Sequence, residues 1–145
     1  MRGYTHLVAG LALYLALAKL GPFSWSLWGA LATAFGSLVP DVDHPRSLGS
    51  RAFAHIPLRH RGFMHSMPAC ALQAALVAWL DWGLAGLYAL GYVLHLALDS
   101  LTPVGVAWLA PISKRRLRGP ARTGGPADHA LLALLSLAAA FMFTQ

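Results

Sequence analysis

Five apolar stretches separated by polar breaks dominate this sequence. They run from about 5 to 20, 25 to 39, 63 to 82, 84 to 101 and 130 to 143. None shows the strict alternation of a strand, so we expect helices. The chain is 57% hydrophobic and only 11% charged, whereas soluble domains carry about 25% charged residues. The pattern predicts an all-α fold, an integral membrane bundle of about five helices in which residues 1–145 form one membrane-embedded domain.

The lengths of these stretches leave two questions open. A span needs roughly 20 residues at about 1.5 Å each, so the first, second and fifth stretches are short, which predicts tilt or local thinning of the bilayer. The second is either a short span or a half-span. The amino terminus has an alternative interpretation as a signal peptide, because Arg2, an apolar run and Ala16-Leu17-Ala18 resemble its parts.

Basic residues predict the orientation. They gather in two loops and are nearly absent from the other loops, which hold Lys19 and Asp81. The basic residues are Arg46, Arg51, Arg59 and Arg61 in the first loop, and Lys114, Arg115, Arg116, Arg118 and Arg122 in the second. The positive-inside rule places both loops in the cytoplasm. We therefore expect a protein of the cytoplasmic (inner) membrane with an inside amino terminus.

The formal charge of +6 would point to nucleic acid in a soluble protein. Here the basic segment has a topological explanation and lacks the interleaved aromatic residues of single-strand binders, so we expect no nucleic-acid partner. Membrane lipid is the expected partner. Anionic phospholipid headgroups should gather near Lys114, Arg115, Arg116 and Arg118, at about 1 kcal/mol for each charge.

Histidines and aspartates occur at the helix ends of this same face. The set is His6, Asp41, Asp43, His44, His60, His65, His95 and Asp99. Helices that run in opposite directions bring all of them within about 10 Å of one membrane surface. His95 and Asp99 are four residues apart on one helix face, inside an otherwise apolar run. A carboxylate there is costly unless it is paired or coordinated.

This set mixes nitrogen and oxygen ligands, which suits a divalent metal. Zn²⁺ is favoured, Mn²⁺ and Fe²⁺ fit the same ligands, and the size of the set leaves room for two ions. The alternative is a polar cytoplasmic cap without metal. In that case His95 and Asp99 form a hydrogen bond, and Asp41 and Asp43 belong to a turn after Pro40.

The motifs resemble those of the YdjM-like family of membrane-bound metal-dependent hydrolases. The matching pieces are Thr5-His6 with Gly10, Pro40-Asp41-Val42-Asp43-His44, His60-Arg61-Gly62 with His65-Ser66, and His95 to Asp99 followed by Thr102 and Gly105. The resemblance implies a small multi-helix membrane protein with a metal site and hydrolase chemistry. Family members often have a glutamate after a Thr-Gly pair near the last helix, where this chain has Asp128.

The leading functional hypothesis is hydrolysis of a phosphoester on a lipid headgroup by a metal-activated water. Either Asp41 or Asp43 is the candidate general base. Arg59 and Arg61, which flank His60, are candidate phosphate clamps, with Arg61 the one assigned to the site. The alternative is a metal-binding transport or scaffold protein without catalysis. Transporters place ionisable groups near the bilayer midplane, whereas the centres of these stretches are free of charge.

Overall fold

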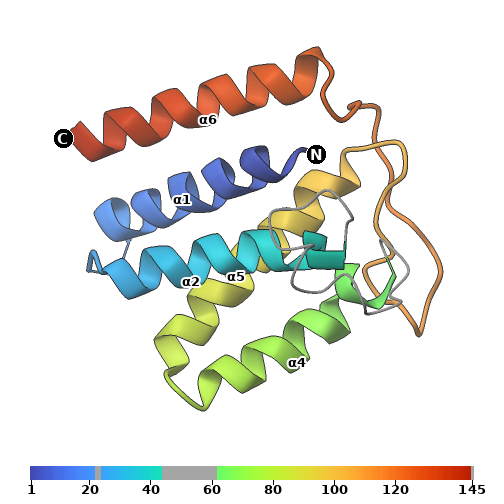
Figure 1. Ribbon diagram of the computed structural model, residues 1–145, viewed down its shortest axis with the longest axis horizontal. Coiled ribbons are helices and arrows are strands. Elements are labelled where there is room, and N and C mark those ends of the chain that lie inside the picture. Colours follow the sequence, from blue (N-terminus) through green and yellow to red (C-terminus); the bar gives the residue numbers. More distant parts are fainter. Residues whose placement is uncertain (22–23, 44–61, 145) are drawn as a thin grey trace.

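The computed structural model describes residues 1–21, 24–43 and 62–144, which form helices and loops (Figure 1). The five α-helices are α1 (Gly3–Leu20), α2 (Leu27–Leu38), α4 (Met67–Ala78), α5 (Trp82–Ser100) and α6 (Pro126–Thr144). Two 3₁₀ helices, η1 (Val39–Asp43) and η2 (Phe63–His65), follow α2 and precede α4. No strand occurs among these residues, so the prediction of an all-α fold with five helices is confirmed.

Polar side chains at the helix starts explain several boundaries. Ser26, Ser66 and Asp81 each accept a hydrogen bond from a backbone N–H in the first turn of the helix that follows. Ser66 and the proline that follows it start α4 four residues later than the apolar stretch begins. The helix also ends at Ala78, four residues before the stretch does. The prediction of a third helix of about 20 residues was therefore wrong, because α4 has 12 residues.

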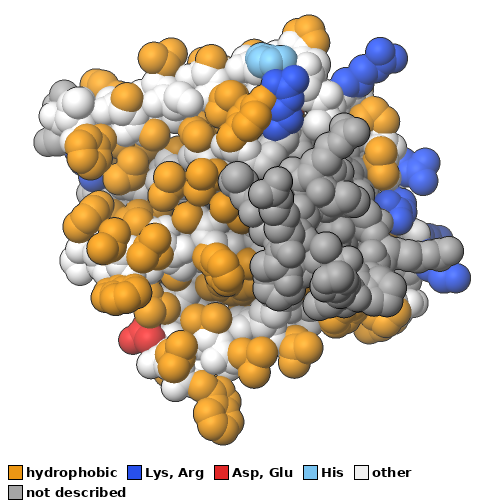
Figure 2. Space-filling view, viewed as in Figure 1, with side chains coloured by type: hydrophobic (Ala, Val, Ile, Leu, Met, Phe, Trp, Pro, Cys, Tyr) orange, Lys and Arg blue, Asp and Glu red, His pale blue; other side chains and the backbone are white. Residues whose placement is uncertain are grey.

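Helix length differs from expectation in α1 and α6 as well. These helices have 18 and 19 residues, and both are long and apolar enough to cross a membrane. The helix α2 is short as predicted, since its 12 residues extend about 18 Å. Asp128 is the only buried residue among those described in α6. Four large apolar side chains of this helix, Leu134, Leu137, Phe141 and Phe143, are exposed, as expected for contact with lipid. Apolar side chains cover much of the face of the molecule shown in Figure 2.

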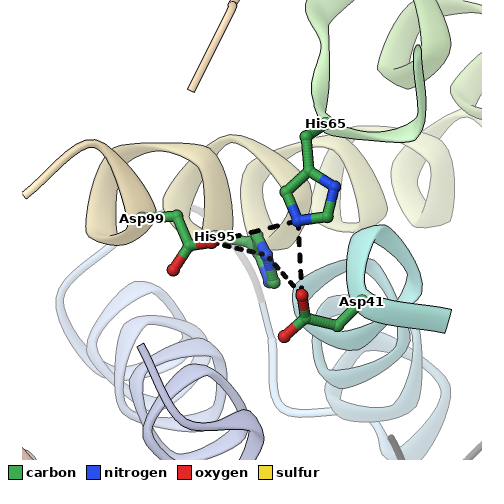
Figure 3. Close-up of side chains that lie close together, drawn as sticks. All are labelled: Asp41, His65, His95 and Asp99. Atoms are coloured by element: carbon green, nitrogen blue, oxygen red, sulfur yellow. Dashed lines mark hydrogen bonds and ion pairs between the residues drawn. The ribbon is translucent and has the colours of Figure 1, made fainter. Parts of the chain in front are cut away.

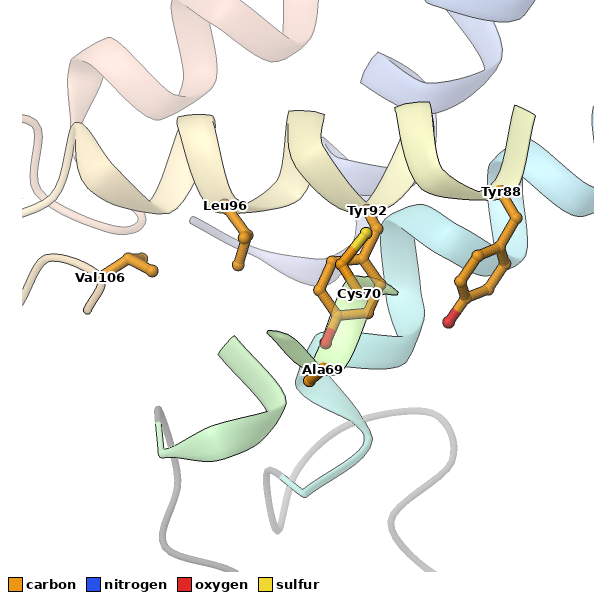
Figure 4. Packing of buried hydrophobic residues seen from close by; sticks show 6 residues of the cluster. All are labelled: Ala69, Cys70, Tyr88, Tyr92, Leu96 and Val106. Atoms are coloured by element: carbon orange, nitrogen blue, oxygen red, sulfur yellow. The ribbon is translucent and has the colours of Figure 1, made fainter. Parts of the chain in front are cut away.

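The helix α5 lies at the centre of the bundle and packs against α1, α2 and α4, while α6 packs against α1 (Figure 1). An apolar cluster fills the space between α4 and α5 (Figure 4). Its buried members are Ala69, Cys70, Tyr88, Tyr92, Leu96 and Val106. The Tyr88 hydroxyl donates to Gln73 Oε1 at 2.7 Å, and the Tyr92 hydroxyl donates to the Met64 carbonyl. The first bond joins α5 to α4, and the second secures η2 to α5.

The two ends of the bundle differ in charge. The basic loop (residues 101–125) lies at the end that holds η1, η2 and the start of α1 (Figure 1). Its Trp108 anchors it, because Nε1 donates to Ser100 Oγ at 2.8 Å and the carbonyl accepts from Met67 N at 2.7 Å. The opposite end carries exposed Lys19 and Asp81. It also carries four exposed tryptophans, Trp25, Trp28, Trp79 and Trp82, as in an interfacial aromatic belt.

Glycines let α2 and α5 approach until their backbones touch. A Cβ atom at Gly91 would clash with the Thr33 carbonyl, and one at Gly36 would clash with the Tyr88 carbonyl. Small residues at such crossings are typical of membrane helices.

We predict that Gly91→Ala destabilises the protein by about 1–3 kcal/mol, because the added methyl group forces α2 and α5 apart. Gly86→Ala on the same helix is the matched control, since a Cβ there meets nothing within 4 Å. Thermal unfolding of both variants in detergent measures the effect. Equal melting temperatures for the two variants would contradict the packing described above.

Candidate metal centre

Four ligand-type side chains from three elements converge at the polar end of the bundle (Figure 3). Asp41 comes from η1, His65 from η2, and His95 and Asp99 from α5. One ligand atom from each lies within 4.8 Å of the others. His65, His95 and Asp99 are buried, whereas the Asp41 side chain is 18% exposed. We call these residues the four-residue centre.

The spacing of these atoms is close to that of metal ligands. Asp41 Oδ1 lies 3.3 Å from His65 Nε2 and 3.7 Å from His95 Nε2. Asp99 Oδ2 lies 3.9 Å from each of the same two nitrogens. Ligands bonded at 2.0–2.2 Å in a tetrahedron are separated by about 3.4 Å. The four distances given lie within about 0.5 Å of this value, and all four ligand atoms lie within 4.8 Å of one another.

A hydrogen bond to the backbone orients His95 toward this centre. Its Nδ1 lies 2.8 Å from the Ser37 carbonyl oxygen. A carbonyl can only accept, so Nδ1 carries the proton and Nε2 has its lone pair free. Nε2 is buried and has no hydrogen-bond partner in the described part of the chain. Metal-binding histidines are held by their second nitrogen in this way, so the residues fit a divalent ion.

Local structure explains how each ligand reaches the site. Pro40 lies in η1, where the chain changes from α-helix to a tighter 3₁₀ turn that brings Asp41 inward. His65 ends η2, and the Ser66 hydroxyl donates to the Phe63 carbonyl at 2.6 Å to close that turn. His95 and Asp99 share one face of α5 because they are four residues apart.

The histidines hold Asp41 in its charged form. Burial alone would raise the pKa of this carboxyl group. The hydrogen bond from His65 and the nearby imidazoles of His95 and His6 outweigh burial, so the pKa lies well below its usual value. An ionised carboxylate is the form that binds a metal.

His6 lies beside the four-residue centre without belonging to it. This buried side chain of α1 stacks on His95, with ring centroids 3.8 Å apart and planes inclined by 18°. His6 Nε2 lies 3.3 Å from Asp99 Oδ1, and the Met1 amino group contacts the same oxygen. The structure thus brings five of the eight predicted ligands together. His44, Arg59, His60, Arg61 and the Asp43 side chain lie outside the described residues, so their roles remain predictions.

Asp128, which stands where family members often have a glutamate, lies at the start of α6. It lies within the first turn of α6, buried, and accepts hydrogen bonds from Gly124 N at 2.7 Å and from Thr5 Oγ1 at 2.9 Å. Asp128 therefore joins α6 to α1 next to His6. Its place on the polar face was predictable, whereas the bond to Thr5 depends on tertiary packing. The Ser37 carbonyl was also missed, because a backbone acceptor has no residue signature.

Comparison with known proteins assigns the chain to a family. The model of the YdjM inner membrane protein family matches residues 1–144. The chain belongs to the YdjM inner membrane protein family. The resemblance inferred from the motifs is confirmed, and so is the expected location in the membrane.

Two relatives illustrate the range of similarity. The uncharacterized protein YvsG of Bacillus subtilis (strain 168) is 31% identical over 153 residues, which cover 99% of this chain and 94% of YvsG. The inner membrane protein YdjM of Escherichia coli (strain K12) is 41% identical over 88 residues. That match covers 51% of this chain and 44% of the relative. No solved structure matches the chain significantly.

We predict that purified protein in detergent retains a divalent metal, and that the double variant His65→Ala with Asp99→Ala loses it, because half of the four-residue centre is gone. His129→Ala is the control, since His129 is exposed and lies outside this centre. Elemental analysis of the three proteins gives the answer. If the intact protein stays metal-free after reconstitution with Zn²⁺, Mn²⁺ or Fe²⁺, the prediction is wrong. The four residues would then form a polar cap without metal.

Proposed function

We propose that the chain is a membrane-bound metal-dependent hydrolase, a phosphoesterase that acts on phospholipid or another phosphoester at the membrane. The observation that supports this proposal is the four-residue centre, in which His95 Nε2 is buried and directed at two carboxylates (Figure 3). Two imidazoles and two carboxylates suit Zn²⁺ first and also Mn²⁺ or Fe²⁺. An ion held there supplies Lewis acidity and activates a water for attack.

Three residues are assigned the roles of metal ligand, general base and phosphate-binding group. Asp41 is committed to the four-residue centre, where its Oδ1 lies near both histidines. Asp43 follows two residues later in η1, and we assign to it the role of general base, which takes the proton from the attacking water. Arg61 is proposed to hold the phosphoryl group through paired hydrogen bonds.

The basic loop supports a lipid as the substrate. Lys114, Arg115, Arg116 and Arg118 are exposed on it, and Lys and Arg side chains gather at this side of the molecule (Figure 2). The same loop exposes Ile112 and Leu117, so it combines positive charge with apolar side chains, as interfacial segments do. Anionic headgroups drawn to this loop would be concentrated at the end of the bundle that holds the four-residue centre.

Non-catalytic metal transport or scaffolding is the competing proposal. A transport site is expected near the bilayer midplane, between the helix centres. The four-residue centre instead combines two short 3₁₀ helices with the last two turns of α5. This position at one end of the bundle favours hydrolysis at the membrane surface.

We predict that the protein in detergent releases phosphate or a phosphorylated headgroup from mixed phospholipids only when metal is present. Asp43→Asn should lower kcat by roughly 10²–10⁴-fold, the usual contribution of a general base, and should keep its metal. Asp41→Asn should lose metal and activity together. Product analysis combined with elemental analysis separates these effects. No metal-dependent product from any phospholipid class would eliminate the lipid version, and metal uptake by proteoliposomes would support transport.

We further propose that the four-residue centre faces the cytoplasm, because the basic loop lies at the same end of the bundle. A cysteine introduced as Lys114→Cys should react with a membrane-impermeant maleimide only after spheroplasts are opened. Lys19→Cys, at the opposite end, should react in intact spheroplasts. The native Cys70 is buried, with 2% exposure, and should not react with the maleimide. Labelling in the reverse order would place the site on the outer side.

A further inference from the structure

His6 is a buried histidine that the four-residue centre does not include. Its side chain is fully buried on α1, and neither ring nitrogen makes a hydrogen bond with a described residue. The ligand atoms of the four residues all lie within 4.8 Å of one another, and His6 is not in that set. Two ligands bonded to one ion at about 2.0–2.2 Å are at most about 4.4 Å apart. The geometry therefore favours a role for His6 other than that of a fifth ligand.

Asp99 presents its two carboxylate oxygens to different partners. Oδ2 lies 3.9 Å from His65 Nε2 and 3.9 Å from His95 Nε2, inside the four-residue centre. Oδ1 lies 3.3 Å from His6 Nε2 and also contacts the Met1 amino group. His6 is thus next to the oxygen that the centre does not use. Because a carboxylate is planar, a partner that holds Oδ1 also determines the direction of Oδ2.

The His6 ring also lies flat on the ring of His95. The two centroids are 3.8 Å apart, and the planes are inclined by 18°. His95 is held at one edge by the Ser37 carbonyl, which lies 2.8 Å from its Nδ1, and His6 covers one face of the same ring. His6 therefore contacts both of the ligands that α5 contributes to the centre.

The packing of α1 places His6 at this position. Gly10 follows one turn later on the same face of α1. A Cβ atom at Gly10 would lie 2.8 Å from Ser37 Oγ, so α1 and α2 approach closely at this level. Thr5, the residue before His6, donates to Asp128 Oδ1 at 2.9 Å and joins the start of α1 to α6. The ring of His6 is therefore held by contacts between helices.

We propose that His6 is a positioning residue of the metal centre. It holds Asp99 by Oδ1, so that Oδ2 is presented to the ion, and it keeps the His95 ring in place. Groups that orient metal ligands in this way typically contribute roughly 10–100-fold to metal affinity. The inference rests on the metal centre of the proposed function and does not require that phosphoesters are the substrate.

The experiment measures the Zn²⁺ affinity of the full chain in detergent by competition with a chelator. His6→Phe keeps a flat ring that can stack on His95 but has no N–H group, and it should weaken Zn²⁺ binding by roughly 10–100-fold. His6→Gln has an amide nitrogen the same number of bonds from Cβ as Nε2, and it should recover most of this loss. His129→Ala removes an exposed histidine outside the centre and should bind as the intact protein does.

X-ray absorption spectra of the Zn²⁺-loaded proteins give a second readout, because they count the imidazoles bound to the ion. A positioning role predicts the same number of bound imidazoles in the intact protein and in His6→Phe. One imidazole fewer in His6→Phe would make His6 a ligand and overturn the inference.

Three further results would overturn it. Equal Zn²⁺ affinity of the intact protein and His6→Phe would mean that the Met1 amino group holds Asp99 without His6. Equal losses in His6→Phe and His6→Gln would show that the N–H group has no part in holding Asp99. Intact protein that binds no Zn²⁺ would overturn the inference together with the metal centre. If the affinities follow the expected order but no product is released from phospholipid, the proposed function is contradicted and the positioning role stands.

Discussion

Burial of ionisable side chains at the end of an apolar bundle is the constraint that organises this protein. His6, His65 and His95 are fully buried, and Asp99 is 1% exposed. An isolated buried charge costs several kcal/mol, so each such group needs a partner of opposite charge, a hydrogen bond or a metal. The chain meets this requirement because its buried histidines and aspartates lie next to one another and serve as partners. The short helices η1 and η2 turn inward at one end of α5 and bring Asp41 and His65 to the pair on that helix.

Helix packing and the four-residue centre depend on each other through α2. Because Gly36 and Gly91 let the backbones of α2 and α5 touch, the carbonyl of Ser37 comes within 2.8 Å of His95 Nδ1. That bond determines which nitrogen of His95 is directed at the carboxylates. A change that separates the two helices would therefore loosen the ligand as well as the bundle. The glycines contribute to the site without touching it.

The sequence predicted the helices and the gathering of ligands well, because both follow from local patterns. Long apolar stretches predict helices, and the four-residue spacing of His95 and Asp99 predicts a shared face. The shortening of α4 was missed, since Phe63 and Met64 are as apolar as the helix that follows. Its cap at Ser66 marked the true start. Bonds between distant segments, such as Asp128 to Thr5, have no local signature.

The exposure of the four-residue centre bears on the catalytic role proposed for it. A structural metal site is closed, with all positions filled by protein, whereas a catalytic site keeps one position open. Here three ligands are buried and Asp41 is 18% exposed, so the centre has one partly accessible side. Asp41, like His65, lies on a short 3₁₀ helix at the end where the basic loop lies (Figure 1). In the proposed function, a substrate held by that loop would approach the centre from this side.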